Sequence, residues 1–422
     1  MVEATAMPPA PRNPLRATLA RFGLASMSSA AVSVSHLLVQ LVSVRRLEAA
    51  EIGTLAFLLV IIQFGYSLSN ALVSTPYTIA VNQHEDEDTG FFFRMNLLLA
   101  VAQALLCAGV AWAMAGPAAA AAFGAAGFFS LIRWFGRANA YAHHNPGGAA
   151  MSDILYAGIV VLGVGLTLAI GARLELFGLA LAIAGMLAIL PFGLSFIARH
   201  RPEALGQAFA AYRPVWKRQS AWTLIGVIST EATSNSHSYI VTLLAGPAAF
   251  APIAVGMLFF RPVNVCVTAL TQLERPRMAR AVAKGDHAAA RGSARAFLAA
   301  LTVIWAGTAA LAALVLWAFP HILIKPTLSL NIVAIAVALS ALLTLVQCIQ
   351  TPISVLTQSR GAFRPLATTS VRSCIFGIAA VTALTLAAPA VYSIAGVVFA
   401  QLVMMLGIYR LDRQWRAQEA AA

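Results

Sequence analysis

The chain has 422 residues, of which 60% are hydrophobic and only 10% are charged, and its formal net charge is +13. The loops between its apolar stretches are no longer than about 25 residues, which leaves no room for a soluble catalytic domain. This composition excludes an ordinary soluble enzyme and predicts a chain that crosses a membrane many times.

Apolar runs of about 20 residues cross a bilayer as helices. The sequence therefore predicts an all-α integral membrane protein of about twelve transmembrane helices, at residues 22–44, 53–80, 95–115, 117–141, 150–171, 176–198, 219–245, 249–272, 296–318, 329–357, 366–388 and 390–410. The predicted organisation is an N-terminal tail at 1–21, a six-helix lobe at 22–198, a linker at 199–218, a second six-helix lobe at 219–410, and a C-terminal tail at 411–422.

The basic residues are distributed unevenly between the two sides of this arrangement. Of the 28 lysines and arginines, 23 lie in or beside the tails and every second loop, four lie in the opposite loops, and Arg261 lies inside a span. Short loops rich in Lys and Arg stay on the cytoplasmic side, so we expect both termini in the cytoplasm. No nucleic-acid partner is expected, because the basic residues are scattered and carry no binding motif.

The two predicted lobes share short sequence matches. Ser33-Val34-Ser35-His36 in the first span resembles Ser234-Asn235-Ser236-His237 in the seventh. Pro76, near the end of the second span, matches Pro276, just past the eighth, and both pairs are about 200 residues apart. A chance match is the alternative. Duplicated halves are common in transporters, where the substrate is handled between them.

Polar residues recur at helical spacing in the first two spans of each lobe and in the tenth span. They are Ser29, Ser33, His36, Gln40 and Ser43; Gln63, Ser67, Asn70, Ser74 and Tyr77; Glu231, Ser234, His237 and Thr242; Arg261, Asn264, Thr268 and Gln272; and Ser340, Thr344, Gln347, Thr351, Ser354 and Gln358. These polar stripes predict a water-filled cavity between the lobes. Hydrogen bonds between neighbouring helices are the alternative explanation.

Two charges, Glu231 and Arg261, are predicted near the middle of the bilayer. A salt bridge between them is one hypothesis; the other is that Arg261 binds an anionic substrate group, because guanidinium matches phosphate oxygens. Arg133 and Arg372 lie nearer the ends of their spans, where they either reach the interface or line the mouth of the cavity. His36 and His237 are expected to be buried and hydrogen-bonded, with titration near neutral pH as the alternative.

Several catalytic and cofactor motifs are absent from the sequence. It contains no GxxxxGK[ST], HExxH or GxSxG motif. The four cysteines are expected to be buried free thiols. The acidic run at 85–88 is expected to be a solvated loop. We therefore expect neither an enzyme nor a bound cofactor or metal, although coupling to H⁺, Na⁺ or the membrane potential remains open.

Three segments resemble those of a known family. They are Arg46-Leu47-Glu48-Ala49-Ala50-Glu51-Ile52-Gly53; Leu244-Ala245-Gly246-Pro247 followed by Ala254-Val255-Gly256; and Glu274-Arg275-Pro276-Arg277-Met278-Ala279-Arg280 with Lys284-Gly285-Asp286. They resemble the corresponding connections of bacterial polysaccharide transporters, the O-antigen and exopolysaccharide flippases of the multidrug/oligosaccharidyl-lipid/polysaccharide exporter superfamily. Glu48 and Ile52 depart from the usual Gly and aromatic residue of the first connection.

The resemblance implies two six-helix lobes that rock around a central cavity in a bacterial inner membrane. It also implies that a polyprenyl-pyrophosphate-linked oligosaccharide is flipped from the cytoplasmic to the periplasmic leaflet, with polysaccharide polymerase and glycosyltransferases as further candidate partners. Arg261 matches a cationic cavity position of the related lipid II flippases, whereas the first span offers His36 in place of Arg. The candidate substrate-binding residues are Arg261, Asn264, Glu231, His36, His237, Asn235, Gln63, Asn70, Arg133 and Arg372.

Three alternatives to a flippase stay open. A cation-coupled multidrug exporter of the same superfamily would rely on carboxylates, of which only Glu231 is predicted at depth. A major-facilitator transporter would carry a Gly/Asp/Arg-rich loop after the second span, and this chain has Asn82-Gln83-His84-Glu85-Asp86 there. A non-transport scaffold of a glycan-assembly complex would depend on its loops and not on its polar stripes.

Overall fold

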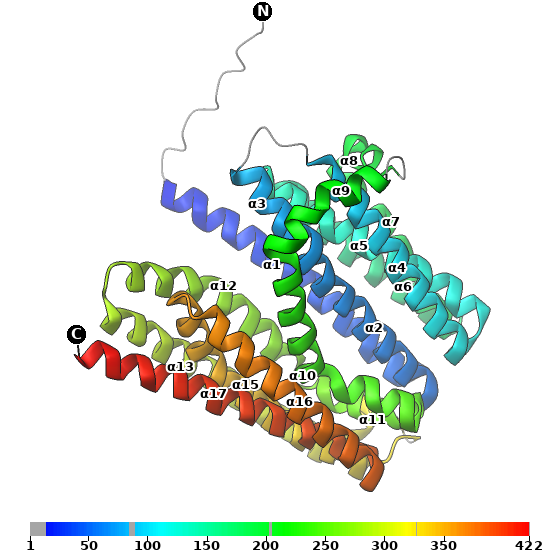
Figure 1. The fold of residues 1–422 in the computed structure, drawn as a ribbon. Coiled ribbons are helices and arrows are strands. Elements are labelled where there is room, and N and C mark those ends of the chain that lie inside the picture. The colour runs from blue at the N-terminus through cyan, green and yellow to red at the C-terminus, as the bar shows by residue number, and fades with distance from the viewer. Residues whose placement is uncertain (1–13, 84–88, 202–204, 326, 422) are drawn as a thin grey trace, which may run out of the picture.

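A computed structural model describes residues 14–83, 89–201, 205–325 and 327–421, and these form helices without strands. The helices of the first half are α1 (Pro14–Arg46), α2 (Ala49–Ser69), the π-helical turn η1 (Asn70–Ser74), α3 (Thr75–Gln83), α4 (Gly90–Ala115), α5 (Pro117–Ala142), α6 (Pro146–Ile170), α7 (Leu174–Leu187), η2 (Leu190–Phe192) and α8 (Leu194–Ala198). The predicted all-α fold class is confirmed, because the described chain is helical and its helices form two bundles (Figure 1).

The linker between the halves contains α9 (Leu205–Val215) and η3 (Trp216–Ser220), which lead directly into α10 (Ala221–Ala245), the first helix of the second half. The second half continues with α11 (Pro247–Leu258), α12 (Arg261–Ala283), α13 (His287–Ala318), α14 (Pro320–Leu323), α15 (Leu330–Ser359), α16 (Phe363–Ala387), η4 (Ala390–Tyr392) and α17 (Ser393–Ala421). Among the described residues, nine helices are long and apolar enough to cross a membrane, and the pair α11 and α12 makes a tenth.

Two predicted spans are broken, and prolines explain both breaks. The span at 249–272 is two helices, α11 and α12, bent by 56°, and Pro262 is the second residue of α12. The span at 176–198 ends as α7 at Leu187, and the chain then turns through Pro191 and through Gly193, whose φ is 86°. Proline lacks an N–H and therefore fits best in the first turn of a helix. Pro191 and Pro262 accordingly lie in the first turns of η2 and α12, each of which starts directly after a break.

A third proline distorts the second span without ending it. Pro76 cannot donate to the carbonyl of Leu72 four residues earlier, and the helix widens into the π-turn η1 just before it. The hydroxyl of Tyr212 in α9 donates to the Leu72 oxygen at 2.7 Å. The linker between the two halves thus supplies the hydrogen bond that Pro76 removes, and α9 is held against the first half.

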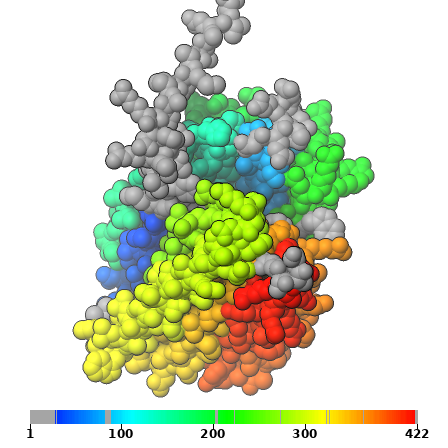
Figure 2. Space-filling model, turned by 90° about the vertical axis from the view of Figure 1, so that its left-hand side faces the viewer, coloured from blue at the N-terminus to red at the C-terminus, as the bar shows by residue number. Residues whose placement is uncertain are grey.

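The two halves meet at the end of the molecule that holds the α1–α2 and α10–α11 connections (Figure 1). An added Cβ at Gly53 of α2 would lie 1.8 Å from the carbonyl oxygen of Pro247 in α11, so only glycine permits this approach. Lys325 forms an ion pair with Glu48 at 2.7 Å, and Arg45 donates to the His321 carbonyl oxygen at 2.5 Å. All three contacts join residues of different halves. Figure 2 shows that the surface of α12 and α13 lies between the first half and α17.

His200, outside the spanning helices, ties the end of the first half to α4. Its Nδ1 donates to the Phe196 carbonyl oxygen at 3.0 Å, and its Nε2 accepts from the Asn96 side chain at 3.2 Å. Burial lowers the pKa of His200 to about 4, and the carbonyl of Phe196 offsets only part of this effect. The imidazole is therefore neutral, since both of its nitrogens are already committed as one donor and one acceptor.

Acidification should therefore destabilise the protein through His200. The unfolded chain takes up this proton near pH 6.5 and the folded chain only near pH 4, so stability present above pH 6.5 is lost as the pH falls toward 4. We expect the thermal midpoint of the detergent-solubilised protein to fall less between pH 7 and pH 4.5 in His200→Gln than in the wild type. The same substitution at the exposed His143 should leave the pH dependence unchanged. Identical pH dependence in wild type and His200→Gln would contradict this assignment.

Candidate functional site

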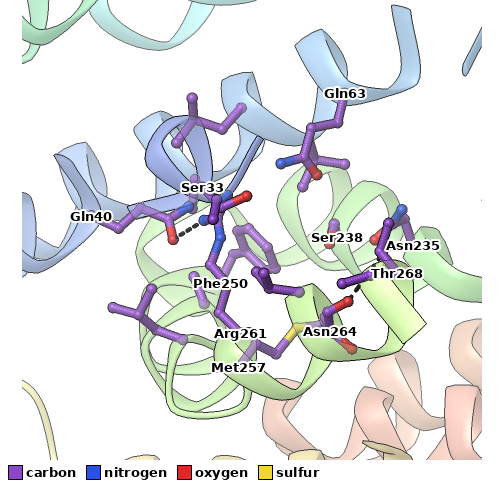
Figure 3. Close-up of a pocket in the computed structure, with 18 residues that line it drawn as sticks. Ser33, Gln40, Gln63, Asn235, Ser238, Phe250, Met257, Arg261, Asn264 and Thr268 are labelled. Carbon is purple, nitrogen blue, oxygen red and sulfur yellow. Dashed lines mark hydrogen bonds between the residues drawn. The ribbon is translucent and has the colours of Figure 1, made fainter. Parts of the chain in front are cut away.

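A cavity of about 400 Å³ lies between α1 and α2 of the first half and α10, α11 and α12 of the second. Each helix contributes one face to it, with residues spaced three, four or seven apart. The polar lining consists of Ser33, Gln40, Gln63, Asn235, Ser238, Arg261, Asn264 and Thr268, and the apolar lining includes Phe250 and Met257 (Figure 3). The polar stripes predicted for these helices therefore meet in one space, although only part of each stripe reaches it.

Arg261 is the first residue of α12, directly after the bend. Its guanidinium points across the cavity and donates to the side-chain oxygen of Gln40 in α1 (Figure 3). The start of a helix carries a partial positive charge, which adds to that of Arg261. The bend thus creates a cationic corner in the cavity, and a neutral amide holds the guanidinium there without cancelling its charge.

Glu231 and Arg261 have separate hydrogen-bond partners and do not form a salt bridge, so that hypothesis is wrong. The Glu231 carboxylate accepts hydrogen bonds from Asn235 at 2.9 Å and from the Tyr239 hydroxyl at 3.0 Å, all within α10. Partners four and eight residues along one helix reach the carboxylate more readily than a guanidinium fixed at the start of another helix. Glu231 does not line the cavity itself, but its partner Asn235 does.

The two candidate histidines are buried beside the cavity and do not line it. His36 contacts the Tyr156 hydroxyl through Nε2 at 2.9 Å. His237 approaches the Met257 sulfur at 3.0 Å and is completely buried. This agrees with the expectation that both are buried and hydrogen-bonded. The matching positions of the two tetrapeptides thus have different environments in the two halves.

Two further candidates lie away from the cavity. The Asn70 side-chain oxygen accepts from the Trp134 indole N–H at 2.8 Å, which ties η1 to α5. Arg372 is an exposed residue of α16 and is not part of the cavity lining. The candidates that the structure brings together are therefore Arg261, Asn264, Asn235 and Gln63.

The environment of Arg133 differs from both predictions made for it. It neither reaches the interface nor lines the cavity mouth: it is 2% exposed and pairs with the fully buried Asp153 of α6 at 2.8 Å. Arg137, one turn further along α5, pairs with the same carboxylate oxygen at 3.0 Å. Ser28 of α1 donates to the other oxygen at 3.0 Å. This cluster joins α1, α5 and α6 inside the first half.

Asp153 was not among the predicted site residues, because only Glu231 and Arg261 were predicted near the middle of the bilayer. A usable signal was present in the lone carboxylate of the fifth span and in the two arginines, spaced four apart, on the neighbouring fourth span. The cluster also approaches the cavity wall. The Arg133 guanidinium lies over the Tyr156 ring at 4.1 Å, and Tyr156 contacts His36 of α1. The helix that carries Ser33 and Gln40 is thus fixed from behind by buried polar contacts.

The described residues contain no group of three or more His, Cys, Asp or Glu side chains that could hold a metal ion. The chemistry available in the cavity is hydrogen bonding by amides and hydroxyls around one guanidinium. Such a lining suits a ligand with many hydroxyl groups and one anionic group.

Comparison with known proteins establishes the fold. No protein-family model matches the sequence, and no curated protein sequence matches it. The structure is similar to that of the lipid II flippase MurJ in an inward closed conformation, with a TM-score of 0.68 at 11% identity, over 92% of this chain and 87% of that one. It is also similar to an inward-facing multidrug resistance MATE family transporter of the MOP superfamily, with a TM-score of 0.64 at 13% identity, over 92% and 96% of the two chains.

A third similar structure is a MOP superfamily transporter from Pyrococcus furiosus, for which reverse polarity of the binding pocket suggests a different function. The TM-score is 0.58 at 12% identity, over 94% of this chain and 95% of that one. The chain described here therefore has the two-lobed fold of twelve-helix transporters, and these structural neighbours are transporters and not enzymes.

Removing the Asp153 carboxylate should be strongly destabilising. Asp153→Asn leaves Arg133 and Arg137 without a counter-charge inside the bundle, a change that costs about 3–5 kcal/mol for a buried pair. We expect a large fall in the thermal midpoint and in the yield of folded protein. Asp286→Asn is the matched control, because the exposed Asp286 caps α13 through a side-chain oxygen that asparagine retains. Equal stability of the two variants would contradict the role given to the cluster.

Proposed function

We propose that this protein flips a polyprenyl-pyrophosphate-linked oligosaccharide across the membrane for O-antigen or exopolysaccharide synthesis. The observation that carries the proposal is the charge of the cavity lining. Among the described residues that line it, Arg261 is the one charged side chain, and no carboxylate accompanies it. A positive cavity attracts a pyrophosphate and disfavours the cationic compounds that a carboxylate would attract.

The pyrophosphate and the saccharide of the proposed substrate each have a counterpart in the cavity. Arg261 would bind the pyrophosphate, because guanidinium forms paired hydrogen bonds to phosphate oxygens. The amides of Gln63, Asn235 and Asn264 would bind sugar hydroxyls through several modest contacts. The polyprenyl tail would remain in the bilayer beside the gap between the halves, where it loses no hydrophobic burial.

The arrangement of the two halves supports alternating access. They are joined at one end by the approach of Gly53 to Pro247 and by the Glu48–Lys325 ion pair. Opening this end requires breaking the ion pair and separating α2 from α11. Arg261 and Gln40 come from different halves, so a substrate that competes for Arg261 would also weaken a contact between them. Substrate binding would in this way be coupled to rocking of the lobes.

The proposed setting is a bacterial inner membrane with both termini in the cytoplasm, as the loop charges indicate. The proposed partners are the bilayer, the lipid-linked oligosaccharide and, in the same process, a polysaccharide polymerase and glycosyltransferases. The proposed energy source is H⁺, Na⁺ or the membrane potential, with no bound cofactor. For the transporter from Pyrococcus furiosus, reverse polarity of the binding pocket suggests a different function, which supports using the charge of the cavity to choose between a flippase and a drug exporter.

The proposal predicts that Arg261→Ala lowers the rate of flipping by about tenfold or more at limiting substrate, while the protein still inserts and folds. Losing a charged hydrogen bond to a phosphate costs about 1.5–3 kcal/mol, which is a loss of roughly tenfold or more in apparent affinity. The measurement uses proteoliposomes with a fluorescent polyprenyl-pyrophosphate oligosaccharide on one side and an external quencher. Arg261→Lys should retain part of the activity. Arg295→Ala, at an exposed position of α13, is the control and should flip normally. Normal flipping by Arg261→Ala would refute the proposal.

The second candidate function is a cation-coupled multidrug exporter, which the contact between Glu231 and the cavity residue Asn235 favours. Glu231→Gln separates the two functions. In a flippase whose substrate is bound by Arg261, glutamine at position 231 keeps an acceptor for Asn235 and Tyr239, and translocation of the lipid-linked saccharide should remain within about threefold of wild type. In a proton- or sodium-coupled exporter, this substitution should abolish gradient-driven efflux of a cationic dye. A scaffold would show neither activity.

A further inference from the structure

A second cavity of about 490 Å³ lies on the first half, between α4, η1 and the linker helices α9 and η3. The residues that form it are Leu72, Val73, Met95, Leu98, Leu99, Ala102, Phe209, Tyr212, Arg213 and Trp216. Those on α4 are spaced three, four and seven apart, and so are those on α9 and η3, so two helix faces form the walls and η1 forms the floor. We call this feature the linker groove. It shares no lining residue with the central cavity.

The lining of the linker groove is apolar except for Arg213 and the Tyr212 hydroxyl. This hydroxyl already donates a hydrogen bond to the Leu72 carbonyl oxygen. Phe209 and Trp216 are 53% and 40% exposed, which leaves large apolar surfaces open along the linker. α4 is itself one of the helices that are long and apolar enough to cross a membrane, so one wall of the groove belongs to a candidate spanning helix. Its volume lies in the range of ligand sites, about 300–1,000 Å³.

Every charged residue in the four described elements that form the linker groove is basic. Arg213 is exposed at its rim, and Lys217 and Arg218 follow within about one and a half turns. The sequences of α4, η1, α9 and η3 contain Arg94 as a fourth cation and no aspartate or glutamate. An apolar groove with a cationic rim complements a lipid that has an anionic headgroup, because basic pockets between membrane helices bind such headgroups.

We propose that the linker groove binds an anionic phospholipid, with one acyl chain between α4 and α9 and its phosphate on Arg213. The proposed occupant is a bilayer phospholipid and not the tail of the transported substrate, because the groove shares no residue with the central cavity and lacks the Asn and Gln amides that line that cavity. This inference stands independently of the proposed function.

Binding would have a mechanical consequence. The linker crosses the first half at the end of the molecule opposite α11 and continues directly into α10, which contributes to the central cavity (Figure 1). A lipid between α4 and α9 would strengthen the attachment that the Tyr212–Leu72 hydrogen bond already makes. The bound lipid would thereby hold the linker on the first half and stabilise the fold in membranes rich in anionic lipid.

The test is a titration of the purified full-length protein with phosphatidylglycerol, and separately with phosphatidylcholine, followed by native mass spectrometry. We expect one phosphatidylglycerol to bind more tightly than the others and more tightly than phosphatidylcholine. Arg213→Gln should weaken this site about tenfold, the effect of losing one charged contact to phosphate. Ala102→Phe, which fills the groove without changing its charge, should weaken binding of both lipids.

Arg295→Gln is the matched control: it removes an equal charge from an exposed position of α13 that does not line the groove, and this variant should bind phosphatidylglycerol within twofold of wild type. Arg261→Ala should also bind it normally, which separates this site from the proposed transport site. Equal binding of the two lipids, or wild-type binding by Arg213→Gln, would overturn the proposal. Displacement of phosphatidylglycerol by equimolar polyprenyl pyrophosphate would also overturn it, and would assign the groove to the substrate tail.

Discussion

Polar groups inside a bilayer have no water to bond with, and the helices of this protein are arranged around that constraint. Pro76 deprives the Leu72 carbonyl of its usual donor, and Tyr212 supplies one from the linker. Asp153 is buried completely, and two arginines and a serine surround it. In both places an unsatisfied group on one helix fixes the position of another, so the same contacts that allow insertion also define the packing of the first half.

The central cavity is lined by polar side chains that contribute little to helix packing. Gln63, Asn264 and Thr268 are exposed to it, and Arg261 is held only by the amide of Gln40. The buried charges of the first half are paired with carboxylates, whereas this arginine is not. A charge that is positioned by a neutral partner remains available to a ligand, because its electrostatic attraction is not cancelled. This difference separates the structural arginines Arg133 and Arg137 from the candidate binding arginine.

The contacts between the halves include close packing of α2 against α11. Gly53 lets α2 approach the start of α11 closely, and the Glu48–Lys325 pair lies in the connecting loops of the same end. Surface ion pairs contribute little, about 0–1 kcal/mol, so the apolar packing of the two helices contributes most to holding this end together. The linker is attached to the first half by Tyr212 and leads directly into α10. The halves are thus joined by contacts that can break and by one continuous helical connection.

The sequence by itself determined the class of the fold. Apolar length and helical spacing predicted about twelve spanning helices and polar faces on α1, α2, α10 and α12, because hydrophobic periodicity is a local property. It also identified Arg261, Asn264, Asn235 and Gln63 as candidates for one site. Only the tertiary structure decided which polar groups pair. The Gln40–Arg261 contact joins positions 221 residues apart, and Ser28 reaches Asp153 from 125 residues away. The bend before Arg261 and the burial of Arg133 depend on neighbouring helices, whose positions no local pattern specifies.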